Sequence, residues 1–326
     1  MNKTMKFLVQ KTESQERLDL YLSKKIKNTT RSYLKKLIEE KKVRINNNLI
    51  TTPATKIKIN DEVSVKFVFK SENSLIPKNI KLNIIYEDND ILIIDKPKGM
   101  VVHPGAGNTK DTLANALAYK YKNRLSDVNG KLRPGIVHRI DKETSGLLII
   151  AKNNLAHAKL SQQFSSHSIN RKYQCLAWGV IRPMTGQIET LIARDKKNRQ
   201  IMTVSDFRGK KAITNYKTLK VFNIKDIPKI SLIECELKTG RTHQIRVHLK
   251  YKGSSILGDN QYGKKNLKFK KINQKFLEIL KEFNGQALHA QTIGFIHPTK
   301  NKQMDFKSNF PLDFKKMLNF LYNLNG

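Results

Sequence analysis

The chain has 326 residues, of which 39% are hydrophobic and 27% are charged, a composition typical of a folded globular protein. Lys and Arg number 62 against 27 Asp and Glu, so the net charge is +35, which favours a polyanion such as nucleic acid as the partner. No apolar run approaches the roughly 20 residues that span a bilayer. No signal peptide is recognisable, and the two cysteines fit no metal-ligand spacing. We therefore expect a cytoplasmic protein with no membrane contact and no bound metal.

A small basic α+β module is predicted over residues 14–70. Apolar residues recur at helical spacing between residues 18 and 26, and a second helix is expected to begin with Thr29 or Thr30 as its cap. An Asn-rich turn at residues 46–48, followed by alternating apolar residues, indicates short strands.

Three basic residues of the second helix, Arg31, Lys35 and Lys36, are expected to share its exposed face. They form either a solvated surface or a face that contacts phosphates. The segments ERLDLYL, TTRSYLKKLIEEKKVRIN and KINDEVSV resemble the S4 type of RNA-binding domain, and this resemblance implies that the module binds RNA. Two turns depart from the S4 pattern, because Lys41-Lys42 and Asn60 stand where that family often has glycine.

Residues 71–80 are predicted to form a linker, because the stretch is polar and contains a proline. We expect one large domain over residues 81–326. Its Asp, Arg, His, Tyr and Gly residues concentrate beside apolar runs in four segments: IDKPKGMVVHPGAGN, GIVHRIDKETSGLLIIAK, RKYQCLAWG and LKTGRTHQIRVHLKYKGSSILGDNQYG.

Several familiar kinds of site are absent from these segments. The glycines of the first segment match neither a dinucleotide-binding nor a phosphate-binding loop, and they fit a tight turn near a ligand or an ordinary loop. His243 and His248 are five residues apart and fit no helical metal pair, so neutral, hydrogen-bonded histidines are expected. Ser145 lies in Thr-Ser-Gly rather than Gly-x-Ser-x-Gly, which favours a cap or turn role over hydrolase chemistry.

Asp141 is the residue most suited to chemistry. It lies between the apolar pair at residues 136–137 and the apolar run at residues 147–151, so its carboxylate is expected at the edge of the core. A carboxylate there needs a partner, and Arg246 or Arg241 could supply the charge that keeps it ionised. Two interpretations remain open: a nucleophile or base, and a buried ion pair without chemistry.

The segment HRIDKETSGLLIIAK resembles the His-Arg-Leu-Asp signature of the RluA/RluD family of pseudouridine synthases. VVHPGAGN precedes it, and RKYQCLAWG, LKTGRTHQIRVHL, LGDNQYG and QALHAQTIGFIHP follow in that family's order, so the resemblance covers residues 81–326. Such enzymes detach uracil from its ribose, rotate it and rejoin it through C5, without cofactor or metal. The resemblance therefore implies an enzyme that isomerises uridine in RNA.

The resemblance also implies roles for individual residues. Asp141 matches the catalytic aspartate, Tyr173 the tyrosine that packs on the target base, and Arg246 the basic partner of the aspartate. The target base must be flipped out of its stack, and Arg139 is expected to fill the vacated space or hold the distorted backbone. Arg241 and His243, in the GRTHQIR segment, are expected to contact RNA.

The fold expected is α+β: an S4-like module, a linker, and a catalytic domain built on a largely antiparallel mixed sheet with the cleft across its centre. HPGAGN and EILKEFNGQALHA most resemble the RluD branch, which implies large-subunit ribosomal RNA as the substrate. We also expect the enzyme to be a monomer. Gly285 departs from this branch, where an arginine commonly precedes QALHA. The alternative is a non-catalytic RNA-binding protein of ribosome assembly, in which Asp141 is only structural.

Overall fold

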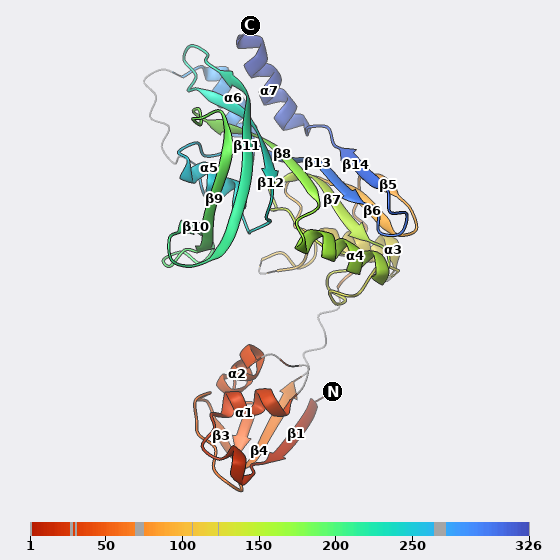
Figure 1. Ribbon diagram of the computed structural model, residues 1–326, viewed down its shortest axis with the longest axis vertical. Helices are drawn as coiled ribbons and strands as arrows, with labels where there is room; N and C mark the ends of the chain where they lie inside the picture. The colour runs from red at the N-terminus through yellow and green to blue at the C-terminus, as the bar shows by residue number, and fades with distance from the viewer. Residues whose placement is uncertain are drawn as a thin grey trace. The chain divides into compact units, whose positions relative to one another are not determined.

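The computed structural model describes residues 2–26, 29, 31–68, 75–105, 107–122, 124–263 and 272–325. The chain divides into two compact units, Met1–Ser74 and Leu75–Gly326, each with its own hydrophobic core (Figure 1). Within the described residues, no helix combines the length and the apolar character needed to cross a membrane.

The first unit is a four-stranded antiparallel sheet with two helices. Its strands lie in the order β1-β4-β2-β3, and β1 precedes the predicted start of the module at residue 14. The elements are β1 Asn2–Leu8, the 3-10 helix Lys11–Glu13, α1 Leu18–Lys25, α2 Arg31–Glu39, β2 Val43–Ile45, β3 Asn48–Ile50 and β4 Glu62–Val68. Thr30, one of the two predicted caps of the second helix, lies outside the described residues. Helix α2 begins at the next residue, Arg31.

In several turns of this unit, residues other than glycine have a positive φ, in the left-handed region. Asn46 and Asn47 have φ values of 48° and 69° and connect β2 to β3, which confirms the predicted Asn-rich turn. Lys41 and Asn60, which stand where S4 domains often have glycine, have φ values of 58° and 66°. The turns therefore keep a left-handed geometry, which Asn adopts more readily than other side chains.

The second unit is built on a ten-stranded sheet whose main path runs β10-β9-β11-β12-β8-β13-β7-β6-β5, with β14 paired to β13. Its pairs are antiparallel except β13 with β7, which confirms the largely antiparallel mixed sheet. The strands are β5 Ile84–Glu87, β6 Ile91–Lys96, β7 Ser145–Ala151, β8 Asn170–Trp178, β9 Thr185–Arg194, β10 Met202–Ser205, β11 Lys210–Phe222, β12 Ile230–Leu237, β13 Leu288–Ile296 and β14 Gln303–Lys307. The helices are α3 Leu113–Tyr121, α4 Asn154–Ser165, α5 Gln244–Tyr251, α6 Gln274–Glu282 and α7 Leu312–Leu324.

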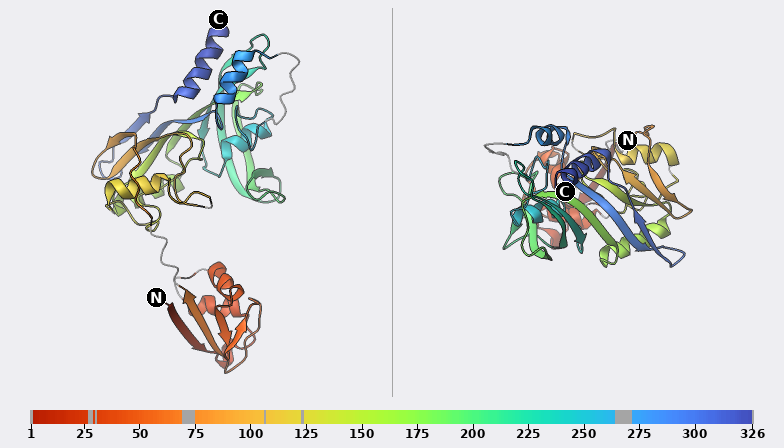
Figure 2. Two further views of the ribbon diagram at one scale, coloured as in Figure 1. Left: turned by 180° about the vertical axis from the view of Figure 1, so that it is seen from behind. Right: turned by 90° about the horizontal axis from the view of Figure 1, so that it is seen from above.

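Strands β6 and β7 are covered on both faces, which explains their continuous apolar runs. Alternate residues of the two strands face different cores: Leu92 and Leu148 join a core that includes α3, whereas Ile93 and Ile149 join a core that includes α4. The views in Figures 1 and 2 show α3 and α4 on opposite faces of this part of the sheet. The loop that precedes β7 is therefore anchored to the most deeply buried strand of the domain.

Gly146 is required where β7 meets β13. Its φ is 110°, and a Cβ added there would lie 2.2 Å from the carbonyl oxygen of Ala290. The turn before it is closed by the backbone N–H of Thr144, which donates to the carbonyl of Asp141 at 3.1 Å. The Thr-Ser-Gly segment thus ends the turn at Thr144 and begins the strand at Ser145, and the glycine permits the close approach of the two strands.

Gly146→Ala is expected to lower the free energy of unfolding by at least about 2 kcal/mol, because the new Cβ combines a strained φ with a backbone clash. Urea denaturation measures the change. Gly105→Ala is the matched control, since a Cβ at Gly105 meets nothing within 4 Å and its φ lies outside the left-handed region. Equal stabilities of the two variants would contradict the close-approach requirement at Gly146.

Candidate active site

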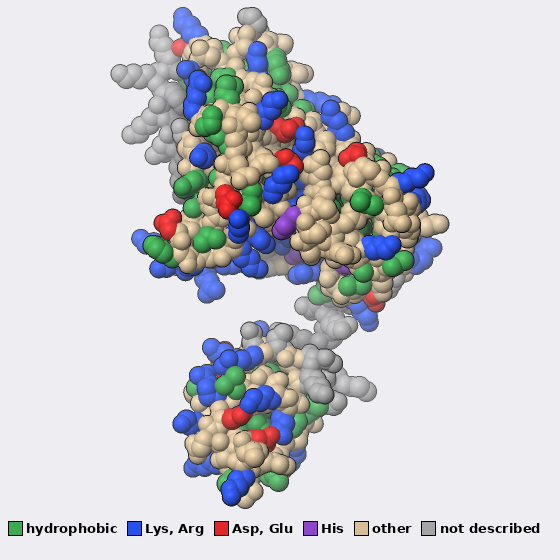
Figure 3. Space-filling model, viewed as in Figure 1, with side chains coloured by type: hydrophobic (Ala, Val, Ile, Leu, Met, Phe, Trp, Pro, Cys, Tyr) green, Lys and Arg blue, Asp and Glu red, His purple; other side chains and the backbone are tan. Residues whose placement is uncertain are grey.

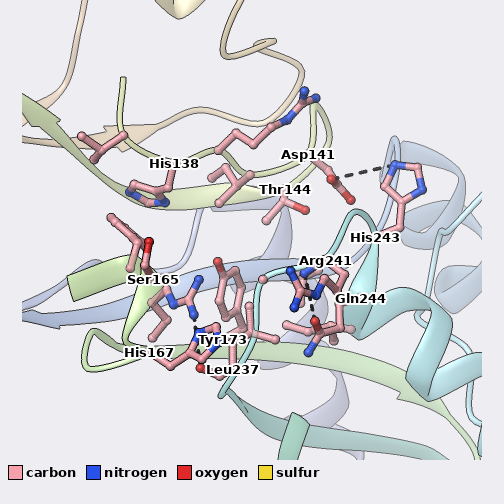
Figure 4. A pocket seen from close by; sticks show the side chains of 18 residues that line it. His138, Asp141, Thr144, Ser165, His167, Tyr173, Leu237, Arg241, His243 and Gln244 are labelled. Carbon is pink, nitrogen blue, oxygen red and sulfur yellow. Dashed lines mark hydrogen bonds and ion pairs between the residues drawn. The ribbon is translucent and has the colours of Figure 1, made fainter. Parts of the chain in front are cut away.

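A cavity of about 550 Å³ lies over the middle strands of the large sheet. Its walls come from the loop before β7, the end of α4, the start of β8 and the loop between β12 and α5. Figure 4 shows Asp141 and Thr144 on one side of this space and Tyr173, Arg241 and Gln244 on the opposite side. The predicted central cleft is therefore present, and its volume is that of an ordinary ligand site.

Asp141 is paired with Arg246 rather than Arg241. The Oδ2 atom of Asp141 accepts a hydrogen bond of 3.0 Å from Nη1 of Arg246, and 21% of the Asp141 side chain remains exposed to the cavity. Arg246 lies on α5 and is only 6% exposed. The carboxylate is thus held at Oδ2 by a buried cation, while part of its surface faces the cavity.

Arg246 is itself fixed by two further groups. Its Nε and Nη2 atoms donate to the two carboxylate oxygens of Asp259, at 2.7 and 2.9 Å, and Nη2 also donates to Gln261 at 3.0 Å. Burial works against the charge of Arg246, but Asp259 and Asp141 together raise its pKa. The bidentate geometry leaves one edge of the guanidinium for Asp141.

The side chain of Asp259 is fully buried and is the counter-charge of Arg246. Burial works to raise the pKa of Asp259, but the hydrogen bonds and charge of Arg246 hold it below the ordinary value. Its Oδ1 atom also accepts the backbone N–H groups of Gln261 and Tyr262, both at 3.0 Å. A carboxylate with this many donors is satisfied without solvent, so the order Asp259, Arg246, Asp141 runs from the interior to the cavity.

His243 lies on the other side of Asp141, with its Nε2 atom 3.9 Å from Oδ1 of the carboxylate. Burial lowers the pKa of His243, although Asp141 partly opposes this effect, so the ring is neutral at physiological pH. Its Nδ1 atom is 2.9 Å from the hydroxyl of Tyr262, and that hydroxyl already accepts the N–H of Met202. The hydroxyl proton of Tyr262 is therefore available to Nδ1, which leaves the ring proton on Nε2, toward Asp141.

Tyr173 forms the opposite wall of the cavity. It lies on β8, pairs with Cys235 of β12 and Ala290 of β13, and is 7% exposed. Burial raises the pKa of its hydroxyl, which keeps the ring neutral. The structure thus brings Asp141, Tyr173 and Arg246, the three predicted catalytic residues, to one site.

The loop that carries Asp141 is supported from the interior by Lys96. The Nζ atom of this fully buried lysine donates to the carbonyls of Pro97, Met100 and Lys142 at 2.7, 2.9 and 3.0 Å. Burial lowers the pKa of Lys96 to about 7, whereas three carbonyl acceptors match the three N–H groups of an ammonium. Lys96 therefore joins the glycine-containing loop after β6 to the residue that follows Asp141.

The other residues of the His-Arg-Ile-Asp segment take separate roles. His138 is half-buried, accepts the backbone N–H of Ile149 at 3.0 Å and stacks on Phe164. Burial lowers its pKa to about 3, so it is a neutral structural residue, as expected for the histidines. Arg139 is exposed, and its Nη1 atom lies 3.0 Å from Nε2 of His103 in the VVHPGAGN loop.

The remaining predicted RNA contacts are divided between the two units. Arg241 lines the cavity, and its Nε atom donates to the carbonyl of Lys211 at 2.9 Å. Arg31 lies in the first unit, where its guanidinium donates to the buried carboxylate of Asp19 at 2.7 Å. Lys35 and Lys36 lie on the same helix, are exposed, and form long i,i+4 ion pairs with Glu39 and Glu40 at 3.9 and 3.6 Å.

Asp259 and Tyr262 are site residues that the sequence did not single out, whereas Arg171 stood out there as one of four arginines in the densest motifs but received no role of its own. Asp259 and Tyr262 belong to LGDNQYG, and Arg171 begins RKYQCLAWG, so the signal was their place in the densest polar motifs. Each acts through a contact with a distant segment, and spacing along the chain does not encode such contacts.

Asp88, Asp90 and His297 are the one group among the described residues that brings three potential metal ligands within 4.8 Å. Its carboxylates already accept hydrogen bonds from protein donors. Asp88 accepts from Lys300 at 2.7 Å, and Asp90 accepts from Asn153 at 2.7 Å. The group joins β5, β6 and the end of β13, and its geometry is that of a structural network.

Comparison with known proteins identifies two family models in the chain. The model described as RNA pseudouridylate synthase matches residues 90–251, and the S4 domain model matches residues 16–63. The ribosomal large subunit pseudouridine synthase D of Zymomonas mobilis is 45% identical over 94% of this chain and 93% of its own length. The uncharacterized RNA pseudouridine synthase YlyB of Bacillus subtilis is 39% identical over 94% of each chain.

A solved structure shares the fold of the second unit. Human RNA pseudouridylate synthase domain containing 4 superposes with a TM-score of 0.55 and 23% identity, and the match covers 74% of this chain and 93% of the human chain. At this identity the likeness concerns the fold alone.

Asp259→Asn is expected to lower the free energy of unfolding at neutral pH by about 3 kcal/mol, because it leaves the buried Arg246 without a full counter-charge. The pKa of Asp259 is lowered by folding, so its contribution is present above the ordinary value of 3.8 and is lost as the pH falls below it. Denaturation at neutral pH and below pH 3.8 should therefore give a difference between wild type and variant that shrinks in acid.

Glu189→Gln is the control for this measurement, since it removes one carboxylate from an exposed ion pair with Lys211. Its effect should stay below about 1 kcal/mol. An Asp259→Asn variant as stable as Glu189→Gln would show that the buried network does not depend on the charge of Asp259.

Proposed function

The chain belongs to the RNA pseudouridylate synthase family and is an RNA pseudouridine synthase, and on this premise we propose that it isomerises a specific uridine of large-subunit ribosomal RNA with Asp141 as the catalytic residue. The observation that carries the proposal is the Asp141 carboxylate, held at 3.0 Å by the buried Arg246 and open to a cavity that Tyr173 closes on the far side.

The reaction breaks the bond between C1′ of the ribose and N1 of uracil and forms a bond between C1′ and C5. The proton on C5 is lost and N1 gains a proton, so the product is an isomer of the substrate. Asp141 takes part either by attack on the sugar or base or by proton transfer. Arg246 stabilises the carboxylate form that both routes need.

Tyr173 is proposed to pack on the uracil, because its buried ring presents an aromatic face to the cavity with the hydroxyl as a polar tip. Reaching this cavity requires that the base leave its stack, at a cost of a few kcal/mol. Arg139 is proposed to take the vacated position. It is exposed on the same loop as Asp141, and its contact with His103 is one hydrogen bond.

The names of the relatives and the charge of the chain support ribosomal RNA as the substrate. Several relatives are named ribosomal large subunit pseudouridine synthase D, at 35 to 45% identity. Lys and Arg side chains are spread over the face of both units in Figure 3, in line with the net charge of +35. A surface of this sign attracts the phosphate backbone regardless of sequence, and the cavity then selects the base.

Gly285 bears on the choice of uridine. Its φ is 90°, and a Cβ there would lie 2.7 Å from Cβ of Glu143, two residues after Asp141. Gly285 and Glu143 both line a smaller cavity of about 330 Å³ that shares Asp141 with the main one. An arginine at this position, as is common in the RluD branch, would place its Cβ against Glu143 in this backbone, so we infer that the wall beside Asp141 is shaped differently from that branch.

The monomeric state and the cytoplasmic location remain predictions from the sequence, as does the absence of a cofactor. The extent of the S4-like module over residues 14–70 and of the catalytic domain over residues 81–326 is likewise proposed. The S4 family match at residues 16–63 and the division of the chain after Ser74 support these limits.

Asp141→Asn is expected to lower the rate of pseudouridine formation by at least roughly 10²-fold, because the amide neither attacks nor accepts a proton. A transcribed ribosomal RNA fragment is incubated with each protein, and pseudouridine is mapped by chemical probing. Asp206→Asn, at an exposed position of the same unit, should keep wild-type activity. Equal, null signals from wild type and Asp141→Asn across the large-subunit RNA would favour the non-catalytic assembly role.

The exposed face of α2 is proposed to contact phosphates. The double variant Lys35→Ala with Lys36→Ala should weaken RNA binding and reduce the slope of log K against log salt by about 0.7 to 0.9 per lost contact. Arg31 is left intact because it pairs with the buried Asp19. The control replaces two other exposed lysines of the unit, Lys58 and Lys66, by alanine. An equal change of slope in the control would show that the effect comes from the total charge of the unit and not from the face of α2.

A further inference from the structure

Arg171 is a buried cation on the wall of the main cavity. It lies at the start of β8, is 8% exposed, and lines the same space as Asp141 and Tyr173. Arg171 and Tyr173 are two residues apart on one strand, so their side chains point to the same face of the sheet.

The guanidinium of Arg171 is positioned by packing. Its central carbon lies 5.5 Å from the ring centroid of Phe164, and a Cβ added to Gly240 would lie 2.9 Å from Nη1. The hydrogen bond it donates is a long one, from Nη2 to the carbonyl of Leu237 at 3.5 Å. Its Nε atom has no hydrogen-bond partner within the described parts of the chain.

No carboxylate of the described residues lies within ion-pair distance of Arg171, and this separates it from the other arginines of the site. Arg246 has Asp259 and Asp141 as partners, whereas Arg139 is exposed to solvent and the half-buried Arg241 donates to the carbonyl of Lys211. Burial lowers the pKa of Arg171, yet a guanidinium remains charged in proteins. A buried charge without a counter-charge is costly, and natural proteins retain one where a ligand supplies the opposite charge.

The reaction generates such a charge inside this cavity. When the bond between C1′ and N1 breaks, its electron pair stays on N1, and the negative charge spreads over the ring to the O2 and O4 carbonyl oxygens. The base must then remain in the cavity as an anion while it turns and rejoins the sugar through C5. A guanidinium presents planar donors that suit oxygens at the edge of a flat ring.

We propose that Arg171 stabilises the detached uracil anion by charge and hydrogen bonding to its carbonyl oxygens, a role that rests on the proposed function. Asp141, held by Arg246, lies on one side of the cavity, and Arg171 acts on the base from the wall that it shares with Tyr173. Because its position is set by Phe164, Gly240 and Leu237 before any RNA binds, the cation needs no rearrangement when the charge develops.

The test compares Arg171→Met with Lys172→Met. Both variants remove one positive charge from β8, but Lys172 points to the other face of the sheet and pairs with Glu234 at 3.4 Å. RNA affinity and the single-turnover rate are measured separately. Arg171→Met should lower the rate by roughly 10²-fold or more with less than a threefold change in affinity, whereas Lys172→Met should leave the rate unchanged.

A second substrate distinguishes charge stabilisation from a structural role. In RNA that carries 5-fluorouridine at the target position, fluorine withdraws electrons and stabilises the detached base, so less help from the protein is needed. Because C5 of this base carries fluorine in place of the proton that uridine loses, fluorine stays on C5 when C1′ is joined there, and the readout is the rate at which 5-fluorouridine disappears from nuclease digests. The loss of rate caused by Arg171→Met should be at least about threefold smaller with this substrate than with uridine.

Equal losses with the two substrates, or a loss that appears only in RNA affinity, would overturn the inference. If Arg171→Met unfolds at a lower temperature than wild type, Arg171→Lys replaces it, which keeps the charge and should retain an intermediate rate on uridine with the same substrate dependence. An inactive wild type would contradict the proposed function itself. An active wild type with an equally active Arg171→Met would contradict the role of Arg171 alone.

Discussion

The buried guanidinium of Arg246 is the constraint on which the site depends. It joins the loop of Asp141 to helix α5, which is 105 residues further along the chain, and to the turn after α5 that holds Asp259 and Gln261. A desolvated cation must be matched by acceptors in fixed directions, so its bidentate pairing with Asp259 decides which edge remains for Asp141. The position of the reacting carboxylate is thus a consequence of charge satisfaction in the interior.

The sheet makes this arrangement rigid. Strand β7 is buried along its whole length, and the turn before it is closed by a hydrogen bond between Thr144 and Asp141. Gly146 lets β13 approach immediately after that turn, and Lys96 holds the next carbonyl, that of Lys142, from the interior. A loop tied at each of these points has few alternative conformations, which suits a group that must meet a flipped nucleotide in one geometry.

The charged groups on the surface and those in the cavity have different roles in this molecule. The excess of Lys and Arg on the surface attracts RNA over long range and gives no selectivity for a base. Inside the cavity each charge has a defined direction: Arg246 is neutralised by Asp259 and Asp141, whereas Arg171 has no carboxylate partner among the described residues. The open charge lies on the wall that also presents Tyr173, where a base is expected to bind.

The sequence by itself determined the α+β class, the Asn-rich turn, the buried strand after Asp141 and the family, because period, turn residues and ordered motifs are local properties of the chain. It left two partners open for Asp141, and the structure selected Arg246 at 3.0 Å. The roles of Asp259 and Arg171 were decided only by tertiary structure. Their function comes from which groups surround a buried charge, and those groups arrive from strands and loops far apart in sequence.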